Sequence, residues 1–258
     1  MRTAAGPRAE PTSEGAEING AQQTLLSVVL LNAVLVGLTL GLFWGGVLVA
    51  RSFGVKAGYS LAPLGFSRPR GGVLAGGGIG MAVGVGALIA SVPINAASAF
   101  VLNRLGYSTE RTIQGPFMRG LIRWVEESPG LAVPAIVLVV VILGPAVEEL
   151  VFRGAVFNGL HRLGGYVSTS LGGPEGSTRT ARQVSFALAA LTSSAFFALL
   201  HLEPVLLPAL LILAVALCTL FARTGSLLPS FVAHATFNSF ATSLIILGGL
   251  GVFDVPPV

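Results

Sequence analysis

Two adjacent glutamates and an arginine inside a long apolar stretch are the residues of this sequence most suited to chemistry. The uncharged run from Leu131 to Val147 leads directly into Glu148 and Glu149, and Arg153 follows Glu149 by four residues. An ionisable side chain inside a bilayer costs about 2.5–3.5 kcal/mol by insertion scales, so each one needs a partner or a function. Glu149 and Arg153 share a helix face and can pair. Glu148 has no cation at that spacing, so we expect it to be the working carboxylate.

Two histidines and an asparagine lie in other apolar stretches. His201 follows Phe197 by four residues, and Asn238 follows His234 by four residues. At that spacing on a helix, the two side chains of each pair point the same way. A single histidine in a span often serves only as a hydrogen-bonding residue between helices. The combination of His201, His234 and Asn238 with Glu148 on three apolar segments favours a shared cavity instead.

The composition places these stretches in a membrane. The 258 residues are 53% hydrophobic and 10% charged, whereas a soluble domain is about 25% charged. A net charge of +4 could suggest nucleic acid, but the cations flank apolar segments, as residues at membrane ends do. The single cysteine, Cys218, excludes an internal disulfide. We therefore predict an integral, multi-pass protein of the cell membrane, in contact with the lipid bilayer and with no nucleic-acid partner.

Six apolar segments are long enough to cross a bilayer, at residues 24–50, 72–101, 131–157, 184–202, 205–222 and 226–250. The break at Glu203-Pro204 separates the fourth from the fifth, because proline disfavours helix at the preceding residue. Only helices or closed barrels satisfy the backbone in lipid. We predict an all-α, polytopic transmembrane helical bundle with six clear spans and up to eight. We expect a single transmembrane helical domain at 23–252, between a disordered polar tail at 1–22 and a short tail at 253–258.

Two polar connections separate the spans. The connection at 102–130 contains apolar residues at helical spacing, namely Phe117, Leu121, Trp124 and Val125. This pattern predicts a short helix on the membrane interface or a loop packed on the bundle. The connection at 158–183 is rich in glycine, serine and threonine, and we expect a loop in which His161 is solvated.

Taken together, these residues resemble the three motifs of the CAAX prenyl protease and bacteriocin-processing family of intramembrane endopeptidases, also called CPBP or Abi. The motifs EExxxR, FxxxH and HxxxN appear here in order as Glu148, Glu149 and Arg153, as Phe197 and His201, and as His234 and Asn238. The resemblance covers residues 131 to about 240. It implies hydrolysis of a peptide bond in a membrane-associated protein or peptide, with or without a lipid group.

Within this resemblance, Glu148 helped by His201 would activate a water molecule. His234 and Asn238 would donate hydrogen bonds to the oxyanion, and Glu149, Arg153 and Phe197 would support the site. The competing arrangement is a zinc ion held by Glu148, His201 and His234, with an open position for water. Because asparagine is a poor zinc ligand and no HExxH is present, we favour the metal-free glutamate mechanism.

Other classes of function fit parts of the pattern. Intramembrane glutamate and histidine also serve as proton relays, so an ion- or proton-coupled transporter is the alternative, and an immunity or scaffolding protein that only binds is a third. No inverted repeat is evident, which counts against the transporter. The only aspartate is Asp254, so a paired-aspartate protease is excluded, and no serine lies in a GxSxG motif.

Overall fold

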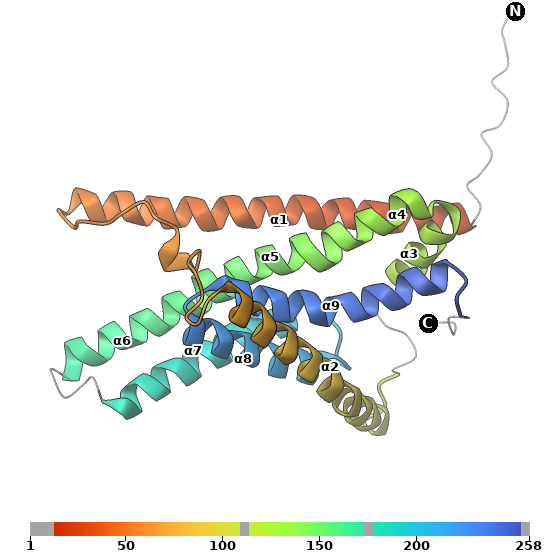
Figure 1. Ribbon diagram of the computed structural model, residues 1–258. Coiled ribbons are helices and arrows are strands. Elements are labelled where there is room, and N and C mark those ends of the chain that lie inside the picture. The colour runs from red at the N-terminus through yellow and green to blue at the C-terminus, as the bar shows by residue number, and fades with distance from the viewer. Residues whose placement is uncertain (1–12, 109–113, 173–177, 254–258) are drawn as a thin grey trace, which may run out of the picture.

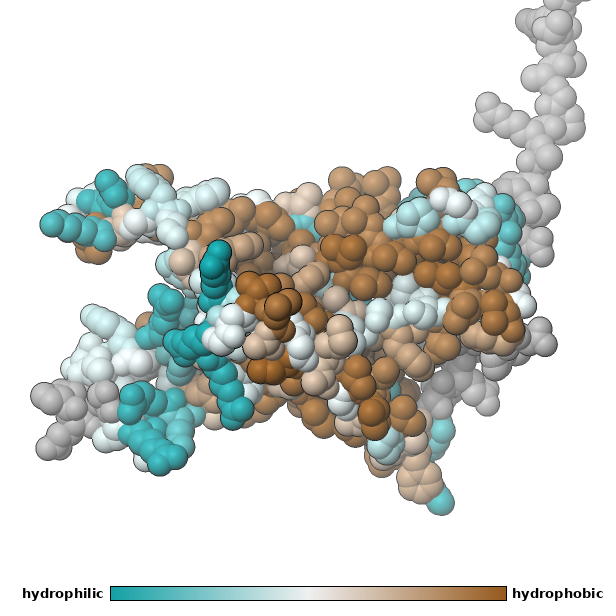
Figure 2. Space-filling view, viewed as in Figure 1, coloured by the Kyte–Doolittle hydropathy of each residue, from teal (hydrophilic) through white to brown (hydrophobic). Residues whose placement is uncertain are grey.

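The computed structural model describes residues 13–108, 114–172 and 178–253, which are mostly helical and contain no strand. Six helical stretches in this part of the chain are long and apolar enough to cross a membrane, namely Gly15–Ser52, Val73–Arg104, Pro129–Ser170, Arg179–Leu199, Leu207–Thr224 and Leu227–Gly249. Hydrophobic residues cover the middle of the bundle and hydrophilic residues gather toward its ends (Figure 2). The prediction of an all-α transmembrane bundle with six spans is confirmed.

Helix α1 (Ser13–Ser52) lies along one side of the bundle, and α2 (Val73–Arg104) crosses the start of α9 (Leu227–Gly249) (Figure 1). The glycines of α2 allow this close contact. A Cβ added at Gly84 would lie only 2.5 Å from the backbone oxygen of Ala233 on α9. Small residues let backbones approach in the same way at many membrane helix interfaces.

The third span is one continuous helix in which α-helical and π-helical segments alternate (Figure 1). Its segments are α4 (Pro129–Ile136), η2 (Val137–Leu143, π), α5 (Gly144–Glu148), η3 (Glu149–Phe157, π) and α6 (Asn158–Gly172). Segments of π-helix are rare and frequently occur at functional sites. Here they precede and follow the segment that carries Glu148.

The prediction of a loop at 158–183 is wrong for its first half, because α6 continues the helix to Gly172. Packing on α7 (Arg179–Leu199) stabilises this extension, since Ser185 Oγ donates to the backbone oxygen of His161 at 3.0 Å. The His161 ring also stacks on Phe157, with centroids 5.7 Å apart. His161 is therefore packed between helices rather than solvated, and residues 173–177 lie outside the described residues.

The break near Pro204 is present as expected. Helix α7 ends at Leu199 and α8 (Leu207–Thr224) begins after the break. Leu202 in the connecting turn has a φ of 55°, and it is the one non-glycine residue with positive φ in the described part of the chain. A left-handed conformation is uncommon for a leucine and costs roughly 1–2 kcal/mol.

The amphipathic part of the connection at 102–130 is a short helix, as one prediction had it, and it packs on the bundle, as the other prediction had it. Helix α3 (Gly115–Glu127) buries its apolar face against the start of α1. The members of this contact are Ile18, Ala21 and Leu25 of α1 and Leu121, Trp124 and Val125 of α3. A Cβ at Gly120 would lie 2.5 Å from the backbone oxygen of Glu17, so the two helices touch.

The same contact corrects the expected disordered tail at 1–22, because residues 13–22 already belong to α1. The sequence of this stretch is polar, but Ile18 and Ala21 are buried under α3. Glu17 also pairs with Arg123 at 3.0 Å and lies 3.8 Å from Arg119. Residues 1–12 and 254–258 lie outside the described residues.

Candidate active site

Glu149 and Arg153 form the expected ion pair at the centre of the bundle. Both side chains are fully buried, and Arg153 Nη1 lies 3.0 Å from Glu149 Oε1. Arg153 Nη2 donates to the backbone oxygen of Ala214 on α8 at 3.4 Å, and the guanidinium lies 4.5 Å from the Phe197 ring centroid. A cation over an aromatic face is attracted by the ring. Arg153 thus joins the third span to α7 and α8.

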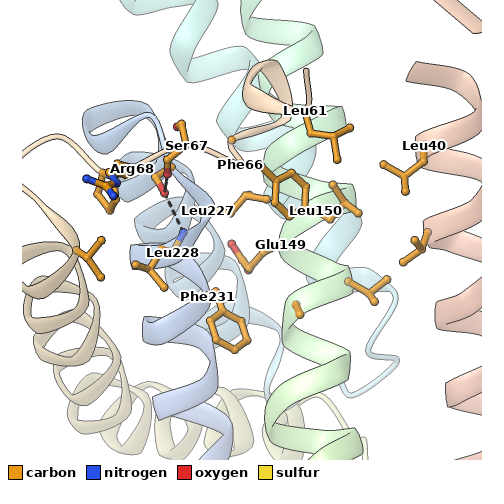
Figure 3. A pocket seen from close by; sticks show the side chains of 17 residues that line it. Leu40, Leu61, Phe66, Ser67, Arg68, Glu149, Leu150, Leu227, Leu228 and Phe231 are labelled. Atoms are coloured by element: carbon orange, nitrogen blue, oxygen red, sulfur yellow. Dashed lines mark hydrogen bonds between the residues drawn. The ribbon is translucent and has the colours of Figure 1, made fainter. Parts of the chain in front are cut away.

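Glu149 also fixes the orientation of His234. Its carboxylate points toward α9 (Figure 3), and His234 Nδ1 lies 3.0 Å from Glu149 Oε1. An ionised carboxylate only accepts hydrogen bonds, so Nδ1 carries the donated proton. A carboxylate that holds one ring nitrogen in this way sets the tautomer and the direction of the imidazole. The other nitrogen, Nε2, is thereby directed to Glu148.

Glu148 faces this directed nitrogen. Its Oε2 lies 3.6 Å from His234 Nε2, and this oxygen has no hydrogen-bond partner in the described part of the chain. The Glu148 side chain is 30% exposed, whereas that of Glu149 is 1% exposed. Of the two adjacent carboxylates, Glu149 is enclosed by its partners. Glu148 is the one whose side chain remains partly accessible.

His201 lies just beyond the end of α7 and contacts the Phe197 ring. Ring centroids are 4.7 Å apart for Phe197 and His201 and 5.4 Å apart for Phe197 and His234, so one buried aromatic ring contacts both histidines. His201 Nδ1 donates to the backbone oxygen of Phe197 at 2.8 Å. Because a carbonyl oxygen only accepts, Nε2 of the neutral His201 ring is left as an acceptor.

The residues that could hold a metal are not gathered as ligands in this conformation. The described residues contain no group of three or more His, Cys, Asp or Glu side chains arranged for a metal ion. The candidate ligand set of Glu148, His201 and His234 therefore does not fit a metal ion as it is arranged. Its one close pair is Glu148 with His234.

Asn238 lies one turn after His234 on α9, and its amide contacts the third span. Asn238 Nδ2 donates to the backbone oxygen of Val140 at 3.1 Å. Val140 belongs to the π-helical segment, where each N–H bonds the carbonyl five residues earlier, as Gly144 N does to Val139 O. The next donor in this register would be Pro145, which has no N–H. The backbone oxygen of Val140 therefore accepts from the Asn238 amide in place of the N–H that Pro145 lacks.

Two further polar residues near the site were not identified from the sequence. Glu203 is buried at 6% exposure, and its Oε1 accepts from the backbone N–H of Gln114 at 2.8 Å. The side-chain amide of Gln114 donates to the backbone oxygen of His201 at 3.2 Å. These contacts anchor the His201 turn to the start of α3. The only signal in the sequence was an acidic residue at the Glu203-Pro204 break, which we used to divide two spans.

The fold and these residues define a multi-pass helical membrane protein with a buried carboxylate–histidine cluster. Residues 130–240 match the family described as type II CAAX prenyl endopeptidase, Rce1-like. This segment of the chain is therefore similar to the CAAX prenyl endopeptidases, a family of membrane-embedded hydrolases. The match includes every site residue predicted from the sequence. No curated protein and no solved structure matches the chain significantly.

Proposed function

We propose that this protein is an intramembrane endopeptidase in which Glu148 activates water to cleave a membrane-associated protein or peptide. The observation that supports this most directly is the 3.6 Å approach of Glu148 Oε2 to His234 Nε2, with the imidazole held through Nδ1. The substrate is a peptide chain at the cell membrane, with or without a lipid group. Glu149 and Arg153 position the cluster and take no part in proton transfer.

In the first step, Glu148 takes a proton from a water molecule and the resulting hydroxide attacks the scissile carbonyl carbon. His201 assists by accepting a hydrogen bond from the water through Nε2. Glu148 then gives its proton to the nitrogen of the departing peptide as the C–N bond breaks. General acid–base catalysis of this kind contributes about 10²–10⁴-fold in rate.

The developing oxyanion needs hydrogen-bond donors. In its protonated form His234 donates from Nε2 while Nδ1 remains bound to Glu149. The Asn238 amide has two N–H groups. One donates to Val140, and the second is the other oxyanion donor of this proposal. Removing one such donor lowers kcat by about 10²–10³-fold in well-studied hydrolases.

The test uses purified protein in liposomes with a library of membrane-tethered peptides, and cleavage is read by mass spectrometry. Glu148→Gln preserves the shape of the side chain and removes the base, so cleavage should fall by about 10²–10⁴-fold with folding intact. Glu127→Gln is the control, because Glu127 is an exposed carboxylate on α3. Cleavage that survives Glu148→Gln contradicts the proposed role.

The same assay is repeated with a chelator. We expect cleavage to continue, because the metal-free mechanism requires no ion. If chelation abolishes cleavage and zinc restores it, Glu148, His201 and His234 act as metal ligands and the acid–base assignment is wrong.

A further inference from the structure

A cavity of about 760 Å³ opens between α1, the segment 61–73, the third span and the start of α9. Its walls are almost entirely apolar, and Figure 3 shows Leu40, Leu61, Leu150, Leu227 and Phe231 around it. This volume lies within the roughly 300–1,000 Å³ of ordinary ligand sites. Glu149 also lines this cavity, and its carboxylate is already bound to Arg153 and His234. The cavity therefore suits a ligand with a long apolar part.

One rim of this cavity carries unpaired positive charge. Figure 3 places Arg68 beside Ser67 at one side of the cavity, and Arg68 makes no hydrogen bond, ion pair or ring contact with the described residues. Arg70 lies close by and donates from Nη1 to the backbone oxygen of Arg223 at 3.3 Å. All three arginines are exposed, and none forms an ion pair with an acidic side chain in the described part of the chain. The rim therefore attracts an anion.

This rim is held firmly in place by the turn between α8 and α9. Leu227 N donates to the backbone oxygen of Gly65, and Arg70 N donates to that of Thr224, both at 3.0 Å. Ser226 Oγ donates to the backbone oxygen of Ser67 at 2.7 Å. Gly65 has a φ of +94°, and a Cβ there would lie 2.5 Å from the Phe221 ring. Arg68 thus projects from a segment fixed at both ends.

The same turn sets the depth of the rim in the membrane. Helices α8 and α9 are both candidate spans, so the turn that joins them lies at one membrane boundary. The segment 65–70 is hydrogen-bonded to this turn and shares its level. Basic side chains at this level meet lipid headgroups. The apolar cavity beside them extends toward the level of Glu149 in the third span.

We propose that this cavity binds one anionic glycerophospholipid of the bilayer. Arg68, with Arg70 and Arg223 nearby, binds the headgroup phosphate by charge-assisted hydrogen bonds. An acyl chain fills the cavity between α1 and the third span. This binding does not depend on the proposed proteolysis.

A second cavity of about 510 Å³ on the other side of the short η1 helix (Ala62–Leu64) is a weaker candidate. Its arginine, Arg162, already donates to Asn158 Oδ1 at 3.0 Å. The guanidinium at that rim therefore already has a hydrogen-bond partner. Arg68 at the first cavity has none among the described residues, so the first cavity is the better anion site.

Native mass spectrometry of the full chain in detergent tests this proposal with phosphatidylglycerol and phosphatidylcholine that carry the same acyl chains. We expect one phosphatidylglycerol to be retained in preference. Arg68→Gln should lower its retention about fivefold, the factor for one basic side chain at an anionic headgroup. Val36→Trp should lower retention because Val36 lines the cavity. The matched controls are Arg182→Gln, an exposed arginine of α7, and Leu38→Trp, an exposed position of α1.

Equal retention of the two lipids by the wild-type chain would overturn the proposal, as would retention that neither Arg68→Gln nor Val36→Trp reduces. A third arm uses a farnesylated peptide in place of the phospholipid. If the wild-type chain retains this peptide and no phosphatidylglycerol, and Val36→Trp abolishes that retention, the cavity binds substrate and the lipid assignment is wrong. Size-exclusion profiles that match the wild type ensure that each variant is folded.

Discussion

His234 Nδ1 and Glu149 Oε1 are 3.0 Å apart, and the same carboxylate oxygen lies 3.0 Å from Arg153 Nη1. One buried oxygen thus accepts a hydrogen bond from a histidine of α9 and forms an ion pair with an arginine of its own helix. Glu148 is the next residue back and is rotated by about 100° around the helix axis. It meets the opposite nitrogen of the same imidazole. In the proposed mechanism the two neighbouring glutamates therefore have different roles: Glu149 positions His234, and Glu148 carries out the proton transfer.

Arg153→Ala should destabilise the protein strongly, because it leaves the Glu149 carboxylate buried without its cation. Breaking one partner of a buried ion pair costs about 3–5 kcal/mol. The measurement is the free energy of unfolding in mixed micelles, together with the amount of folded protein in the membrane. Arg123→Ala is the matched control, since its pair with Glu17 is partly exposed and pairs of that kind contribute about 0–1 kcal/mol. If the two variants have the same free energy of unfolding, the proposed structural role of Arg153 is wrong.

The neutral double variant Glu149→Gln with Arg153→Met separates stability from positioning. Replacing both members of a buried pair removes the uncompensated charge, so the double variant should be more stable than either single variant. Cleavage should not recover, because an amide holds His234 Nδ1 less firmly than a carboxylate does. The readouts are unfolding free energy and kcat for all three variants. Recovery of cleavage together with stability would show that Glu149 does not position His234.

Leu202→Gly should be more stable than Leu202→Ala, which reverses the usual order of these two residues. Leu202 has a φ of 55° and is 64% exposed, so truncation loses little burial. Alanine keeps the cost of the left-handed conformation and glycine removes it. We expect the Gly variant to gain about 1 kcal/mol over the Ala variant. Its cleavage rate should be lower, because the turn that carries His201 becomes freer. A Gly variant less stable than the Ala variant contradicts this account.

The six spans could be predicted from the sequence because apolar length is a local property of the chain. The helical start of α1 and the helix α6 could not, since each is stabilised by another element. Ile18 and Ala21 are buried only because α3 covers them, and α6 is held by α7 through Ser185. The i, i+4 spacing predicted the Glu149–Arg153 pair. Nothing in the spacing indicated that Glu149 also binds His234, because that contact joins residues 85 positions apart.

The hydrogen bond from Asn238 to the backbone oxygen of Val140 was not indicated by the HxxxN motif. A double-mutant cycle with Pro145 measures its contribution to stability. Asn238→Ala removes the donor to Val140 O and should cost about 0.6–1.7 kcal/mol, the range for hydrogen bonds between membrane helices. Pro145→Ala introduces an N–H in the π-helical register that can bond the same carbonyl. Asn238→Ala should therefore cost less in the Pro145→Ala background. Independent, additive costs would contradict this link.

The catalytic part of the same cycle decides whether Asn238 also acts on the oxyanion. If it does, Asn238→Ala lowers kcat by about 10²–10³-fold in either background, because a repaired backbone bond supplies no oxyanion donor. If Asn238 only satisfies Val140, Pro145→Ala restores most of the lost cleavage along with the lost stability. The Pro145→Ala single variant must retain measurable cleavage for this comparison, and its kcat is the reference. Unfolding free energy and kcat measured on the same four proteins therefore separate the two roles of this amide.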